Sequence, residues 1–212
     1  MAPSTVAAVL GVDGICAGVR TGPTGTVPAW GGEPVGIALE DLQFTVGEGP
    51  SREATEVGAP VLAPDLADTV TRWPAFAPAA MDLGARAVFV FPLRIGAISV
   101  GTLLAYRAVP GLLAAAQVTD GLALADAVTL ALLHRQWPPA GDSEHASPGW
   151  VRPVVYRAEV HQATGMVSVQ LGVSLAEALV RLRAHAWTGG RSLSDVAADV
   201  VARRLRFDDP SL

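Results

Sequence analysis

The sequence predicts an α+β fold in two parts, a sheet-and-helix domain followed by a small three-helix bundle. Short apolar runs separated by glycine- and proline-rich turns fill the first two thirds of the chain, as in an antiparallel sheet with flanking helices. Residues 137–150 then hold three prolines, two glycines and two serines, a composition that cannot pack a core. After them the apolar spacing becomes helical. We therefore place a first domain at 1–136, a linker at 137–150 and a second domain at 151–212.

The first domain begins with a short helical end at residues 1–12, followed by a hairpin. Its strands are Ile15–Arg20 and Thr26–Trp30, on either side of a Thr-Gly-Pro-Thr-Gly turn. Ser51 is placed to cap a later helix. The remaining pattern predicts, in order, helices at 36–44 and 51–57, a strand at 60–63, a helix at 73–83, paired strands at 87–94 and 100–107, and a long helix at 114–136.

The second domain carries clear helix-capping signals. Gly172 ends the first helix, and Ser174 with Glu177 forms a capping box for the second. Ser192 and Asp195 are a weaker form of the same box at the start of the third. The apolar positions of the third helix are Leu193, Val196, Ala197, Val200, Val201 and Leu205.

Charge is uneven along the chain. Residues from 151 onward hold eight arginines and six acidic residues, so this part is +2 and residues 1–150 are −7, out of a formal −5. Such asymmetry is typical of an acidic body with a mildly basic binding tail. All 15 basic residues are arginine, whose planar guanidinium suits bidentate phosphate contact.

Several classes of protein are disfavoured by the sequence. Cys16 is the only cysteine, so no disulfide framework, zinc cluster or CxxC pair is expected. The apolar segment Val109–Leu133 is interrupted by Asp120 and Asp126, and no basic region precedes the apolar N-terminal stretch, so we expect a cytoplasmic protein with no membrane partner. We find no nucleophile with a base, no paired carboxylates and no metal-ligand spacing, and so expect no enzyme, no metal and no cofactor.

Three strings stand out in the tail: 157–166 (RAEVHQATGM), 175–186 (LAEALVRLRAHA) and 191–197 (RSLSDVA). In this order and spacing the tail resembles the ANTAR family of RNA-binding antiterminator domains over about residues 152–206. Thr164 stands where the family has lysine in the first string. The resemblance implies a three-helix bundle that contacts RNA phosphates with its cations and reads loop bases.

We select the RNA-binding candidates on this resemblance. Gln162 is able to donate to a base or a phosphate, whereas Gly165 either permits close approach of RNA or only lets helices pack tightly. The candidates are Arg157, Gln162, Thr164, Gly165, Arg183, Arg191, Arg203 and Arg204.

Four strings stand out in the first domain: 42–50 (LQFTVGEGP), 60–66 (PVLAPDL), 72–76 (RWPAF) and 86–93 (RAVFVFPL). Through them the domain resembles a GAF domain over about residues 5–136. The resemblance implies a sensor that takes a small-molecule ligand or serves only for dimerisation. A leading helix shorter than the family's indicates a front that is truncated or completed by a partner chain. Candidate pocket residues are Trp30, Phe44, Trp73, Phe89, Phe91 and Tyr106, for each of which plain core packing is the competing interpretation.

A homodimer is expected from the helix at 114–136, which has two apolar stripes. One stripe is able to face its own sheet and the other a partner. The stripes are Val118, Leu122, Ala125 and Leu132, and Leu124, Val128 and Ala131.

Together these features predict a signal-responsive transcription antiterminator that binds RNA hairpins in nascent transcripts. Two alternatives stay open. The last two helices, joined at Gly189-Gly190, also suit a helix-turn-helix that binds DNA. The chain also suits a sensor or oligomerisation protein that has lost RNA binding along with the family lysine.

Overall fold

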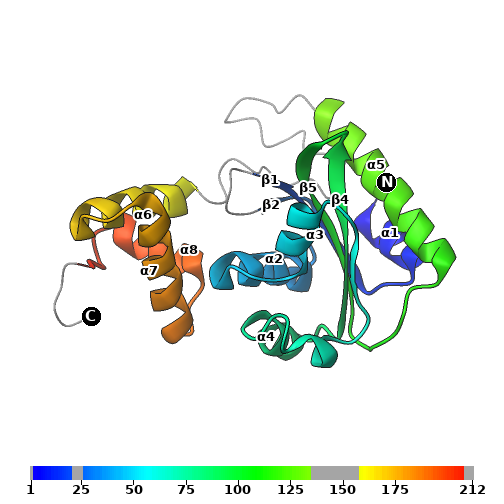
Figure 1. Cartoon of the computed structure of the whole chain (residues 1–212), viewed down its shortest axis with the longest axis horizontal. Coiled ribbons are helices and arrows are strands. Elements are labelled where there is room, and N and C mark those ends of the chain that lie inside the picture. The colour runs from blue at the N-terminus through cyan, green and yellow to red at the C-terminus, as the bar shows by residue number, and fades with distance from the viewer. Residues whose placement is uncertain (1, 21–25, 135–157, 208–212) are drawn as a thin grey trace.

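The computed structural model describes residues 2–20, 26–134 and 158–207, which form a sheet domain and a helical unit. The sheet domain contains α1 to α5 and the helical unit α6 to α8 (Figure 1). The predicted linker at 137–150 lies outside the described residues. Its proposed boundaries stay predictions.

Five antiparallel strands form one sheet in the order β2-β1-β5-β4-β3. Both predicted hairpins are present. The second is tighter than expected, because Gly96 takes a left-handed φ of 57° and, with Ala97, makes a two-residue turn. The strands are β1 (Gly14–Arg20), β2 (Thr26–Gly31), β3 (Val61–Ala63), β4 (Ala87–Ile95) and β5 (Ile98–Arg107).

One face of the sheet is covered by α1 (Pro3–Leu10) and α5 (Ala115–His134) (Figure 1). Strand β4 sends Phe89, Phe91 and Leu93 to this face, as the two-residue period of a strand requires. Helix α5 lies so close to the sheet that a Cβ on Gly121 would collide with the Phe91 ring. By length and mean hydropathy α5 would suffice to cross a membrane, but its buried side packs on this sheet.

The two apolar stripes expected on α5 are divided differently in the structure. Ala125, Val128 and Leu132 together face the sheet, although we expected Val128 in a different stripe from Ala125 and Leu132. The leucines left exposed are Leu122, Leu130 and Leu133. Apolar residues lie around much of the circumference of α5, so the position of the sheet decides which of them are buried.

The opposite face is covered by α2 (Pro34–Val46), α3 (Pro50–Val57) and α4 (Phe76–Asp82) (Figure 1). A short 3₁₀ turn (Leu66–Thr69), which we did not predict, precedes α4; the Asp65 carboxylate caps it by accepting from the Ala67 amide at 3.0 Å. Strand β4 sends Val88 and Val90 to this face. Because β4 is buried on both sides, it reads as a continuous apolar run rather than an alternating one.

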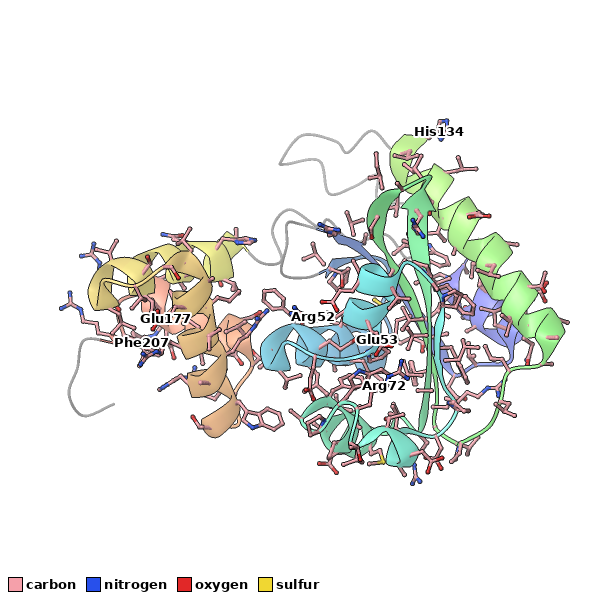
Figure 2. All side chains as sticks on the ribbon, viewed as in Figure 1. Arg52, Glu53, Arg72, His134, Glu177 and Phe207 are labelled. Atoms are coloured by element: carbon pink, nitrogen blue, oxygen red, sulfur yellow. The ribbon has the colours of Figure 1, made fainter. Side chains whose placement is uncertain are left out.

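Polar side chains of α2 and of the loop that follows it hold α3 and α4 in place. Gln43 accepts from the Ser51 amide at 2.7 Å and so satisfies the start of α3. Glu48 accepts from the amides of Ala75 and Phe76 at 2.6 and 2.9 Å and so caps α4. The ion pair of Arg72 with Glu53 (Figure 2), with Nε to Oε2 at 2.9 Å, joins α3 to the segment before α4.

Helix α4 begins at Phe76, three residues later than predicted. Trp73 precedes a proline, which disfavours helical backbone at that position. Trp73 instead packs its ring edge-on to Phe76 at 6.1 Å between centroids.

The helical unit consists of α6 (Ala158–Leu171), α7 (Leu175–Thr188) and α8 (Leu193–Val201), and no strand occurs within 158–207. The expected caps are present: Ser174 and Ser192 accept from the amides of Glu177 and Asp195 at 3.2 and 3.0 Å. Helix α8 ends before Leu205, because Arg203 takes a left-handed φ of 59° and turns the chain. Leu205 still packs on the core of the bundle.

Removing the Glu48 cap should lower stability. We expect Glu48→Ala to reduce the free energy of unfolding by roughly 0.5–2 kcal/mol, the usual effect of losing a cap. Glu56→Ala is the matched control, since Glu56 forms only an exposed pair with Arg52 on α3, worth about 0–1 kcal/mol. Urea unfolding measures both; equal loss in the two variants would contradict this role of Glu48.

Candidate nucleic-acid interface

The three helices of the C-terminal unit share one apolar core. Its members are almost fully buried. One of them, Phe44, comes from α2 of the sheet domain. The core residues contributed by the helices are Val160, Ala163, Val167, Ala178, Leu179, Leu182, Ala186, Leu193, Val196, Ala197 and Val200.

Gln162 and Gly165 lie on an open side of α6. Gln162 is exposed, and Gly165 is half-buried three positions later, so they share one edge of the helix. A Cβ placed on Gly165 would meet nothing within 4 Å. Tight packing among the described helices therefore does not require this glycine.

Thr164 faces the inside of the bundle. It is 8% exposed, and its hydroxyl donates to the Val160 carbonyl at 2.6 Å. The expectation that Thr164 contacts RNA is therefore wrong for this conformation. A lysine there would have to carry its ammonium group out past α6, since a buried unpaired charge is strongly unfavourable.

Arg191 and Arg204 converge on Asp199 of α8. Arg191 Nη2 donates to one carboxylate oxygen at 2.6 Å and Arg204 Nε to the other at 2.7 Å. These hydrogen bonds, first that of Arg191 and then that of Arg204, hold the pKa of Asp199 below its ordinary value. Arg203 directly precedes Arg204, takes a left-handed backbone conformation and is exposed. The three arginines together place cations at both ends of α8.

Arg183 does not join this set. Its Nε donates to the Phe44 carbonyl at 2.9 Å, and its guanidinium carbon lies 5.3 Å from the centre of the Phe44 ring. The sheet domain thus holds the second-helix arginine. Arg157 lies outside the described residues.

The C-terminal segment of the helical unit packs against α6 and α7. Phe207, labelled in Figure 2, packs its ring at 5.4 Å from that of His185 on α7. Its amide donates to Gln170 Oε1 of α6 at 3.2 Å. These contacts fold the residues after α8 back onto the bundle and so position the Arg203–Arg204 turn.

The aromatic residues proposed for a ligand pocket do not converge on one space. Trp30, Phe89 and Phe91 pack under α1 and α5, Trp73 and Tyr106 pack under α2 and α4, and Phe44 packs in the helical unit. The core interpretation describes these positions better. The sequence could not show which core each aromatic residue joins, because this depends on which face of the sheet its side chain occupies.

The sheet domain instead contains a buried polar cluster that the sequence analysis missed. Glu40, 1% exposed, accepts from the hydroxyls of Thr26 at 2.6 Å and Ser51 at 2.8 Å. Gln43 Nε2 also donates to Ser51 Oγ at 3.0 Å. The sequence offers no clear signal for this cluster, because Glu40 stands beside other polar residues in the segment that forms α2.

Tyr106 lies at the end of the same face. Burial foremost, together with the Glu33 carboxylate 3.4 Å from its hydroxyl, raises the pKa of Tyr106 to about 12. The phenol is therefore neutral at physiological pH. Among the residues that the structure describes, no group of three or more histidine, cysteine or acidic side chains is placed to hold a metal ion.

Comparison with known protein families identifies the second part of the chain. The family model of the ANTAR domain matches residues 154–201, which span α6 to α8. The C-terminal unit is an ANTAR domain. No match was found among curated proteins.

Solved structures similar to the chain were found for the part that precedes the ANTAR domain. A domain of a two-component sensor histidine kinase protein from Sinorhizobium meliloti 1021 is 13% identical, with a TM-score of 0.51 over 62% of this chain and 86% of that one. The GAF domain of the Acinetobacter phosphoenolpyruvate-protein phosphotransferase is 12% identical, with a TM-score of 0.46 over 62% and 78%. At these identities the likeness concerns the fold alone. The predicted α+β fold, a GAF-like domain followed by an ANTAR domain, is confirmed.

The two glycines in the middles of α5 and α6 should respond oppositely to the same substitution. We expect Gly165→Ala to raise the free energy of unfolding by roughly 0.5–1 kcal/mol, since the site is open and alanine favours helix. Gly121→Ala should lower it by roughly 1–3 kcal/mol, because its Cβ would collide with Phe91. Thermal or urea unfolding checks the sign, and a destabilised Gly165→Ala variant would show that the open edge of α6 is wrongly described.

Proposed function

We propose that the chain is a cytoplasmic, signal-responsive regulator, not an enzyme, whose ANTAR domain binds RNA hairpins in nascent transcripts and so prevents a terminator from forming. The observation that carries the proposal is the ANTAR match at 154–201 on a folded bundle. The GAF-like domain either senses a small molecule or serves dimerisation.

Two features of the ANTAR domain support contact with RNA. Arg191 and Arg204 each use few of their five N–H donors on Asp199, so donors remain for a phosphate. The carboxylate also restrains both side chains, which lowers the entropy lost on binding. The open edge at Gly165 allows a nucleotide to approach the backbone of α6.

Cation removal tests the proposal. Arg191→Gln and Arg204→Gln should each weaken binding to RNA hairpins and reduce the salt slope by about 1, as expected when one phosphate contact is lost. Gly165→Ala should also weaken binding if RNA approaches α6 there. Arg52→Gln on α3 of the GAF-like domain is the control. Fluorescence anisotropy at several salt concentrations measures affinity and slope.

The alternatives are separated in the same titration. Tighter binding to duplex DNA than to RNA hairpins would favour the helix-turn-helix interpretation. Absence of binding to either would favour a sensor that has lost RNA binding. The buried Thr164 supports this alternative, because it stands where the family has a lysine and offers no cation to RNA.

We further propose a homodimer through the sheet face that carries α1 and α5. Val9 is 68%, Leu130 57% and Leu133 53% exposed there, an apolar surface that a second copy would cover. Leu130→Glu should convert the dimer to a monomer in light scattering at micromolar concentration. Leu112→Glu, on an exposed leucine before α5, should leave it dimeric. A monomeric wild-type chain would exclude this assembly.

A further inference from the structure

The last turn of α2 is held by the ANTAR domain rather than by its own domain. The Phe44 side chain is 7% exposed and belongs to the core formed by α6, α7 and α8. The Phe44 carbonyl, near the C-terminal end of α2, accepts from Arg183 Nε at 2.9 Å. A cation at this end of a helix is also favoured by the helix dipole. Figure 1 shows α2 extending from the sheet domain toward α7 and α8.

The preceding turn of the same helix is fixed inside the GAF-like domain. Glu40 lies one turn before Phe44 and is held by the hydroxyls of Thr26 and Ser51. Gln43 is held by the amide and hydroxyl of Ser51. Helix α2 is therefore a rigid link whose position in one domain sets the position of Phe44 in the other.

The contact between the domains does not fill the space between α2 and α7. A groove remains open between α2 and α7, and Val180 and Trp187 on its ANTAR side are 59% and 48% exposed. Contacts of this kind between domains of one chain open and close readily. The groove is lined by Thr45, Val46, Gly47, Ala75, Val180, Arg183, Ala184 and Trp187.

We propose that the last turn of α2 is a latch: while Phe44 fills the ANTAR core and its carbonyl holds Arg183, this arginine is withheld from RNA, and opening of the latch presents it. The proposal rests on the RNA-binding function above. In this proposal Arg183 contacts RNA only when the latch is open, whereas Arg191 and Arg204 are exposed in both the closed and the open state.

Loss of the Phe44 ring should open the latch. Because apparent affinity scales with the population of the competent state, Phe44→Ala should tighten binding to an RNA hairpin by roughly tenfold or more. It should also raise the radius of gyration in small-angle scattering and speed hydrogen exchange in α7. Phe44→Leu, which keeps an apolar side chain in the core, is the matched control and should resemble the wild type in all three measurements.

A cross-link provides a second test should Phe44→Ala fail to fold. Ala75→Cys with Ala184→Cys places one thiol on each side of the groove, and Cys16 is buried. A cleavable bismaleimide should weaken RNA binding, and cleavage should restore it.

The outcomes separate the latch from the RNA-binding function. Equal RNA affinity in the wild-type, opened and cross-linked chains would overturn the latch while leaving RNA binding intact. Unchanged scattering and exchange in a folded Phe44→Ala chain would overturn it too. If no form binds any RNA hairpin, the proposed function fails, and the latch fails with it as a gate for RNA.

Discussion

Burial of Phe44 in the ANTAR core is the contact on which the arrangement of the two domains depends. Transfer of a phenylalanine side chain from water to a core contributes roughly 1.5–3 kcal/mol, and the charge-assisted hydrogen bond of Arg183 contributes about the same again. These terms are large enough to hold the domains together and small enough for a binding partner to overcome. The ANTAR domain also gains a core residue, which matters for a bundle of this size.

Four arginines of the ANTAR domain form hydrogen bonds or ion pairs within the described residues. Arg181 pairs with Glu177, Arg191 and Arg204 with Asp199, and Arg183 with a carbonyl of α2. The charges of the residues from 151 onward are largely balanced, with a net charge of only +2. Exposed ion pairs of this kind contribute only about 0–1 kcal/mol each to stability.

Local signals predicted most of the secondary structure. The Ser174 and Ser192 caps, the glycine stops and the two hairpins depend on residues within a few positions of one another, and each is present. The errors fall where a distant partner decides the outcome. The side of α5 that is buried depends on where the sheet lies. Helix α8 ends where Arg203 takes a left-handed conformation, and the sequence has no glycine there to indicate the end of the helix.

The sequence by itself determined the two-domain order, the α+β class, the helical caps and the set of cations of the ANTAR domain, because periodicity and capping are short-range effects. Only the tertiary structure decided where Phe44, Thr164 and Arg183 point. Phe44 and Arg183 are 139 positions apart, and their contact exists only because both domains present complementary surfaces. Packing of this kind is set by the whole fold, and no local pattern encodes it.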